Sequence, residues 1–150
     1  MRPLPGHRAG CGGSRWLGMV MVMSDFSVKN LKEVDDAFAD RGLDGEARFG
    51  RKHLGSEHLG VSYFRYGPNL RSPLGHRHRE QEEAYVVVAG SGRAKLGDEI
   101  VDVRQWDVVR VAPPVVRSFE AGPEGLEVIA IGSDRPEGGD GEVVEDHWSD

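Results

Sequence analysis

Most of the chain alternates between apolar and polar residues with a period of two, which is the spacing of a β-strand. Leu59–Tyr66, LGVSYFRY, is rich in aromatic and β-branched residues and predicts one strand. Arg93–Leu96 and Glu99–Val103 flank Gly97-Asp98, a pair typical of a tight hairpin turn. Further strands are predicted over residues 83–89, 108–111, 116–121 and 126–131.

Glycine and proline residues punctuate the chain between these strands, as at Gly67-Pro68-Asn69, Ala112-Pro113-Pro114 and Gly122-Pro123. We count about eight or nine short strands at close spacing and almost no helix. This pattern predicts an all-β fold, either an antiparallel sandwich or a barrel. The sequence has no internal repeat and no sign of a second domain.

A short helix is the exception near the start of the folded part. Asn30 followed by Glu33 resembles a capping box, and apolar residues then recur at helical spacing until Gly42. We therefore expect a short N-terminal helix over about residues 31–41.

The two ends of the chain differ in composition from the middle. Several methionines up to Met23 each offer a start of translation, so we interpret residues 1–22 as a disordered N-terminal extension. Residues 133–150 hold seven acidic side chains among several glycines and are interpreted as an acidic, flexible tail. Trp148, within this tail, is a candidate to dock on the barrel. The folded domain is then expected over residues 23–132.

Charge and cysteine content exclude some classes of partner. The formal net charge of −6 provides no electrostatic footprint for nucleic acid or for an anionic membrane. The apolar run Trp16–Met23 is too short to span a bilayer. The single cysteine, Cys11, cannot form an internal disulfide, which suits a cytoplasmic location.

Candidate chemistry is concentrated in the stretch from Gly75 to Gly92. Residues i and i+2 of a strand point to one face, so His76 and His78 would reach the same point. If the chain turns over residues 79–82 and returns antiparallel, Glu83 meets them there. Two imidazoles and a carboxylate form a suitable first shell for a divalent transition metal. The alternative is a solvated loop, because HREQEE is dense in charge.

The spacing His76-x-His78-x4-Glu83-x6-Gly90 resembles the first sequence motif of the cupins. Downstream, Asp107-x-Val109-x-Val111-Ala112-Pro113 through Phe119 resembles the second motif. The resemblance covers roughly residues 59–131. It implies a small double-stranded β-helix, or jelly-roll cupin barrel, with a pocket inside and a tendency to form homodimers.

The resemblance also implies a ligand set for Fe, Mn, Ni or Zn. His76, His78 and Glu83 fall on three metal-ligand positions, whereas the fourth, a histidine in cupins, falls on Arg117. A guanidinium stays protonated and offers no lone pair, so it cannot be a ligand. The metal could survive with three ligands, or Glu83 could pair with Arg117 in a metal-free site. Arg117 could also bind an anionic group, or its side chain could point to solvent. Because Arg117 lies two residues before Phe119, both lie on the same face of the strand, which favours an inward side chain.

Two functions follow as expectations. The first is a cupin that binds a divalent metal and a small, anionic organic ligand, acting as a metal-dependent oxygenase or isomerase. Arg117, Tyr85 and Phe119 are its candidate ligand-binding residues, and Tyr85 is also a candidate acid; no catalytic residue is assigned. The alternative is a non-catalytic, metal-free small-molecule-binding cupin that uses Arg117.

Overall fold

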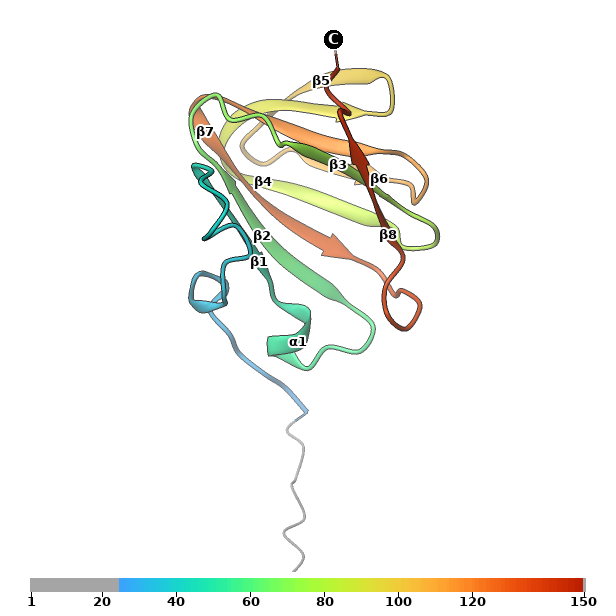
Figure 1. The fold of residues 1–150 in the computed structure, drawn as a ribbon. Coiled ribbons are helices and arrows are strands. Elements are labelled where there is room, and N and C mark those ends of the chain that lie inside the picture. Colours follow the sequence, from blue (N-terminus) through green and yellow to red (C-terminus); the bar gives the residue numbers. More distant parts are fainter. Residues whose placement is uncertain (1–24, 150) are drawn as a thin grey trace, which may run out of the picture.

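The computed structural model describes residues 25–149, so the predicted disordered extension at residues 1–22 lies outside the described residues. The described chain is built mainly of strands (Figure 1). In chain order the elements are η1 (Leu31–Glu33), β1 (Gly45–Phe49), α1 (Arg51–Leu54), β2 (Gly60–Tyr66), β3 (Leu74–His78), β4 (Glu83–Leu96), β5 (Glu99–Arg104), β6 (Val108–Val111), β7 (Arg117–Gly132) and β8 (Gly141–Glu145).

Two long strands, β4 and β7, form the backbone of the fold. They pair antiparallel from Glu83 opposite Gly132 to Leu96 opposite Arg117, with register shifts around Gly90. Gly90 has a φ of 72°, and a Cβ there would lie 2.0 Å from a backbone oxygen of β7. Glycine is therefore required where the two strands pass each other closely and bend.

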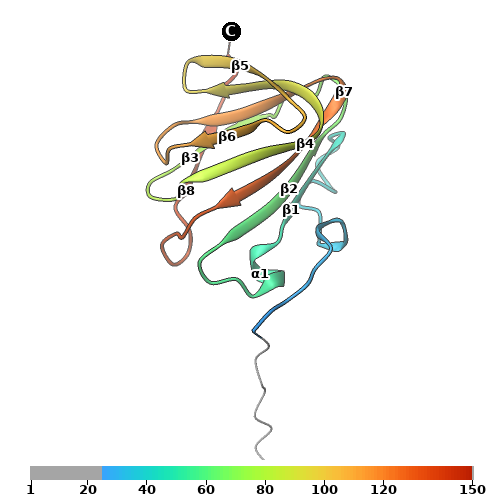
Figure 2. The same ribbon diagram turned by 180° about the vertical axis from the view of Figure 1, so that it is seen from behind.

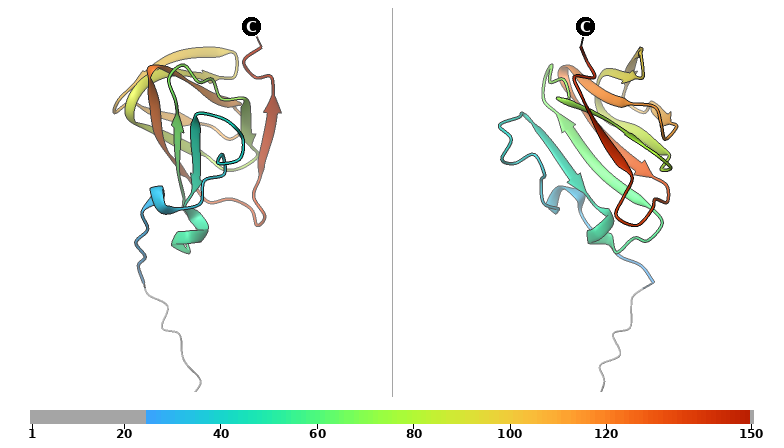
Figure 3. Two further views of the ribbon diagram at one scale, coloured as in Figure 1. Left: turned by 60° about the vertical axis from the view of Figure 1, so that its left-hand side comes forward. Right: turned by 45° about the vertical axis from the view of Figure 1, so that its right-hand side comes forward.

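The bend divides the barrel into two walls that share β4 and β7. The first half of β4 and the second half of β7 join β1, β2 and β6 in the order β1-β2-β7-β4-β6. The other halves join β8, β3 and β5 in the order β8-β3-β7-β4-β5. Figures 1 to 3 show the two walls facing each other across a common interior.

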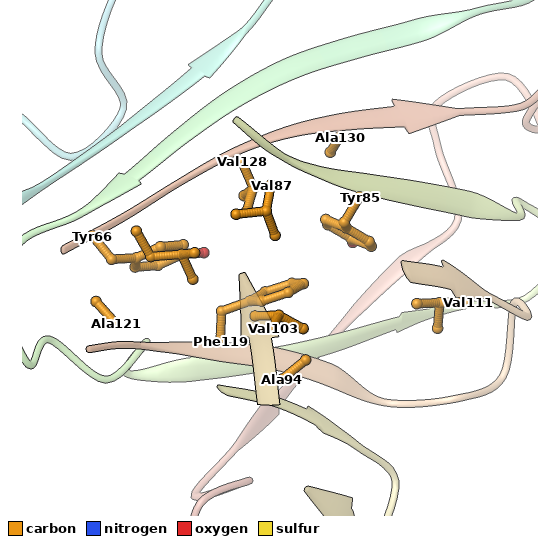
Figure 4. Packing of buried hydrophobic residues seen from close by; sticks show 11 residues of the cluster. Tyr66, Tyr85, Val87, Ala94, Val103, Val111, Phe119, Ala121, Val128 and Ala130 are labelled. Carbon is orange, nitrogen blue, oxygen red and sulfur yellow. The ribbon is translucent and has the colours of Figure 1, made fainter. Parts of the chain in front are cut away.

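The interior is filled by apolar side chains from both walls (Figure 4). Aromatic rings dominate it: the Phe119 ring centroid lies 5.0 Å from that of Tyr85 and 6.4 Å from that of Tyr66. Burial of these rings stabilises the fold, because each aromatic side chain removes a large apolar area from water. The buried cluster comprises Tyr66, Tyr85, Val87, Ala94, Val103, Val111, Phe119, Ala121, Leu126, Val128 and Ala130.

The predicted all-β, double-stranded β-helix architecture is confirmed. Leu59–Tyr66 corresponds to β2, and the hairpin at Gly97 joins β4 to β5 with a φ of 61° at that glycine. Some predicted strands are continuous in the structure. The segments separated at Gly90 and at Gly122 belong to single bent strands, because both stretches of each keep pairing with the same partner.

The predicted N-terminal helix over residues 31–41 is wrong beyond its first turn. Only the 3-10 turn Leu31–Glu33 forms, with the side chain of Asn30 accepting a hydrogen bond from the Lys32 amide. At Asp36 the chain makes an isolated bridge to Arg48 of β1, and the Ala37 amide donates to the carbonyl of Ala47 at 2.8 Å. Residues 37–42 then form turns, in which the Arg41 amide donates to the carbonyl of Phe38.

The prediction of a flexible tail over residues 133–150 is also wrong for most of its length. β8 pairs with β3 over five residues, and composition gave no sign of it because its acids lie on the exposed edge. The docking of Trp148 is confirmed. Trp148 is 7% exposed, and the guanidinium of Arg71 lies 4.8 Å from the centroid of its ring. The C-terminal segment is therefore part of the barrel.

Within residues 25–149 none of the helices has the length and apolar character needed to cross a membrane.

Trp148→Ala is expected to lower the free energy of unfolding by about 3 kcal/mol, since truncating a buried tryptophan usually costs about 3–5 kcal/mol. Chemical denaturation measures this. Trp106→Ala is the matched control, because Trp106 is 71% exposed and should change stability by less than about 0.5 kcal/mol. Equal effects of the two substitutions would show that the C-terminal segment is not docked.

Candidate metal centre

The two histidines of β3 lie on the same side of one strand and point into the mouth of the barrel. β3 pairs with β8 on one side, and on the other side its His76 lies directly opposite Arg117, the first residue of β7. The imidazole ring centroids of His76 and His78 are 5.3 Å apart and the rings are nearly perpendicular, at 88°. The alternation of a strand therefore brings both rings to one point, as the spacing predicts.

Glu83 reaches the same point from the opposite wall. It is the first residue of β4 and pairs with Val111 of β6 and Gly132 of β7. The expected antiparallel return of β4 alongside β3 is wrong, because β3 pairs with β7 and β8 and the first half of β4, which begins at Glu83, lies in the other wall. Residues 79–82 cross the barrel mouth between them. Glu83 Oε2 nevertheless lies 3.3 Å from Nε2 of His76 and 3.3 Å from Nε2 of His78.

The three side chains could hold a metal ion. One donor atom from each lies within 4.8 Å of the others. The side chains of His78 and Glu83 are largely buried, whereas 36% of the His76 side chain is exposed. The cluster therefore sits at the mouth of the barrel and meets solvent on the His76 side.

The hydrogen bonds of His78 fit a metal ligand. Its Nδ1 lies 2.9 Å from Oδ1 of Asp140, a buried carboxylate that can only accept, so the proton belongs on Nδ1. The opposite nitrogen, Nε2, is buried and lies 3.3 Å from Oε2 of Glu83, but the two atoms do not have the geometry of a hydrogen bond. Its lone pair faces the cluster. A carboxylate behind a ligating imidazole is the usual arrangement of metal-bound histidines.

Electrostatics keep the carboxylate of Glu83 ionised. Burial alone would raise its pKa, but the hydrogen bonds with His76 and Tyr85 and the nearby imidazole of His78 outweigh burial and lower it. In turn Glu83, with Asp140 behind the ring, raises the pKa of His78 against the effect of burial. A metal ion that binds His78 would have to displace the proton of the charged imidazole, so metal binding should be weaker in acid.

Tyr85 forms the floor of the cluster. Its hydroxyl donates a hydrogen bond to Oε2 of Glu83 and lies 3.3 Å from Nε2 of His76. Burial, and secondarily the charge of Glu83, raises the pKa of Tyr85 well above its usual value, so the phenol stays neutral. Tyr85 can therefore serve as a hydrogen-bond donor here.

Arg117 points inward, as its parity with Phe119 predicts. It is fully buried, and its Nε lies 3.7 Å from Oε2 of Glu83. Nη1 donates to the carbonyl oxygens of His76 at 3.3 Å and Pro113 at 3.4 Å. Nε and Nη2 have no hydrogen-bond partner among the described residues. A buried cation with two unfilled donors is costly unless an anionic acceptor satisfies it.

One aromatic residue lies beneath the cluster and one further acid lies outside it. Phe119, a candidate ligand-binding residue, is 2% exposed and packs on Tyr85 in the core. Glu82, the neighbouring carboxylate, faces outward and pairs with Arg110 on β6. The structure therefore selects Glu83 as the acid of the site.

Asp140 is the site residue that sequence reasoning missed. It lies 62 positions from His78 in the chain and falls in the segment interpreted as a mobile acidic tail. Acidic composition hid it, because nothing in the pattern distinguishes this buried carboxylate from its exposed neighbours.

The space inside the barrel beneath the cluster is occupied by Tyr85 and Phe119, so the site is a mouth rather than a deep pocket. A separate open cleft of about 540 Å³ lies between β4, β5 and β7. Its charged lining, which includes Arg93, Asp102 and Glu120, contains none of the cluster residues.

No protein-family model and no curated protein matches the sequence. A cupin protein from Bacteroides fragilis matches 75% of this chain and 86% of its own at 18% identity, with a TM-score of 0.62. A double-stranded β-helix protein from Klebsiella pneumoniae matches 79% of this chain and 96% of its own at 15% identity, with a TM-score of 0.61.

Oxalate decarboxylase from Bacillus subtilis is also similar, with 23% identity over 79% of this chain and a TM-score of 0.63. This chain spans about a third of that protein, 32% of its length. The likeness is one of fold. The described chain has the double-stranded β-helix fold of these cupin proteins, so the fold that the resemblance implies is confirmed.

Arg117→His is expected to tighten divalent-metal binding at least about tenfold, or 1.4 kcal/mol. It replaces a repelling guanidinium by a third imidazole at the wall that faces Glu83. Competition with a chromophoric chelator for Zn²⁺ measures the affinity. Arg110→His adds a histidine on the exposed face of β6 and is the control. Unchanged affinity in Arg117→His would mean that this position does not face the metal.

Proposed function

We propose that this cupin binds a divalent transition metal, Fe, Mn, Ni or Zn, through His76, His78 and Glu83. The observation that carries the proposal is the buried Nε2 of His78. It makes no hydrogen bond among residues 25–149 and lies 3.3 Å from Oε2 of Glu83, while Asp140 accepts the proton on the other side of the ring.

A metal held by two imidazoles and one carboxylate keeps open coordination positions and supplies Lewis-acid or redox chemistry there. An oxygenase or isomerase acting on a small organic ligand fits this chemistry. The chain itself would contribute the Tyr85 hydroxyl, which is neutral and able to donate a hydrogen bond beside the metal ligands.

Arg117 would bind the anionic part of that ligand. Its Nε and Nη2 are buried donors that a carboxylate could fill in bidentate fashion, with part of the Glu83 interaction given up. The similar decarboxylase from Bacillus subtilis is named for oxalate, a small dicarboxylate, which supports small carboxylates as the first ligands to test.

A second candidate function is a metal-free binding module. The observation that favours it is the approach of Arg117 Nε to Glu83 Oε2 at 3.7 Å, which neutralises the carboxylate that a metal needs. In this case Arg117 binds the anion alone and the histidines line the mouth.

His76→Ala/His78→Ala is expected to abolish metal binding, because it removes two of three ligand donors. Elemental analysis after supplementation with iron, manganese, nickel and zinc measures bound metal per chain. His53→Ala/His58→Ala removes two histidines that lie outside the cluster, between β1 and β2, and should leave the metal content unchanged. Equally low metal in all three proteins would overturn the metal proposal.

Oxalate and other small carboxylates are expected to raise the melting temperature of the protein, since a ligand bound only to the folded state stabilises it. Arg117→Met should lose this shift, whereas Arg110→Met, on the exposed face of β6, should keep it. A shift that needs added metal supports the metal-dependent cupin. A shift in full without metal supports the binding module. Retention of the shift in Arg117→Met would exclude Arg117 as the anion site.

Homodimer formation and a cytoplasmic location stay predictions from the sequence and the family resemblance.

A further inference from the structure

The C-terminal segment, residues 133–149, lies directly against the candidate metal centre. β8 pairs with β3 over its whole length, and Gly141 is the register partner of His78. The start of the segment is tied to the loop between β3 and β4: Gln81 Nε2 donates to the carbonyl of Ser133 at 2.7 Å, and the Ser133 amide donates to that of Glu82 at 2.9 Å. Trp148 anchors the other end. The segment is therefore held at both ends around the histidines.

One carboxylate connects this segment to the site. Asp140 is 2% exposed, and its Oδ1 accepts the Nδ1 proton of His78 at 2.9 Å. Its Oδ2 accepts the amides of Glu80 at 2.7 Å and Gln81 at 2.9 Å. Burial alone would raise the pKa of Asp140, but these three donors hold it at about 2. The carboxylate is thus fully engaged, with one oxygen for the loop and one for the imidazole.

We infer that Asp140 is a positioning residue of the metal centre, which holds His78 in the tautomer whose Nε2 can ligate. A neutral imidazole carries its proton on either nitrogen, and only the tautomer with the proton on Nδ1 presents a lone pair to the cluster. Because Oδ2 is fixed by two backbone amides, Oδ1 has a fixed place and selects that tautomer. The inference rests on the proposed metal-binding function.

Asp140→Asn tests the inference at nearly constant size. The amide oxygen is expected to remain with the two backbone amides, which places the NH₂ group against His78 Nδ1. The imidazole proton must then move to Nε2, where it blocks the metal. Removing such a partner typically lowers metal affinity about 10–100-fold. Competition with a chromophoric chelator for Zn²⁺ should show a loss in this range.

Glu142→Gln is the matched control. Glu142 lies on β8 two residues away, is exposed, and pairs with Arg77 at 2.8 Å. The substitution removes one carboxylate from β8 without changing the contacts of the histidines. The Zn²⁺ affinity should therefore stay within about twofold of that of the parent protein.

A spectroscopic readout separates positioning from a merely structural role. In the metal-free parent protein at a pH where the ring is neutral, ¹⁵N chemical shifts of His78 should report a protonated Nδ1 and an unprotonated Nε2. In Asp140→Asn the shifts should report a protonated Nε2 and an unprotonated Nδ1. A neutral His78 protonated on Nε2 in the parent protein would overturn the inference, whether or not the variant folds.

The two proposals fail in distinguishable ways. If the parent protein binds no Zn²⁺, the proposed metal function fails, and the tautomer measurement still decides the role of Asp140. If the parent binds Zn²⁺ and Asp140→Asn binds it equally well, the metal function stands and the role of Asp140 is overturned.

Discussion

The continuous pairing of β4 with β7 is the constraint on which the rest of the structure depends. These two strands hydrogen-bond to each other through both walls, and the bend at Gly90 turns one sheet into two facing layers. Without the bend, Glu83 and the histidines of β3 would lie on one extended surface. With it, the start of β4 faces β3 across the barrel mouth. The convergence of the cluster is thus a consequence of sheet curvature rather than of a local turn.

A balance of buried charge follows from this geometry. Glu83 and Asp140 place two carboxylates near the mouth, and Arg117 places one guanidinium between the core and the acid. Buried ionic groups are tolerated only when each has partners, and here His78 lies between the two acids. The arrangement leaves the imidazole Nε2 and two guanidinium nitrogens as the unfilled polar atoms of the site. One cation and one anion would satisfy all three.

Sequence reasoning recovered the parts of this site that depend on local periodicity. The two-residue spacing of His76 and His78 and the parity of Arg117 with Phe119 are properties of single strands, so they can be read without knowing the fold. The partner strands cannot be read in this way. The chain gives no local sign that β3 pairs with β8 rather than with β4, and Asp140 lies in a stretch whose composition is that of a solvated tail. The helix expected over residues 31–41 is interrupted for a related reason, because Asp36 bridges to Arg48 of β1 and the residues after it form turns.

Tyr85 gives the barrel mouth a size limit. Its ring, backed by Phe119, plugs the interior directly below the ligating atoms, while His76 is the most exposed of the four charged or polar side chains around them. In the proposed function, a ligand would therefore approach past His76 and meet the phenol of Tyr85. A smaller residue at this position would deepen the mouth without any change in His76, His78 or Glu83. The depth of the mouth and the proposed metal site would in this way depend on different residues.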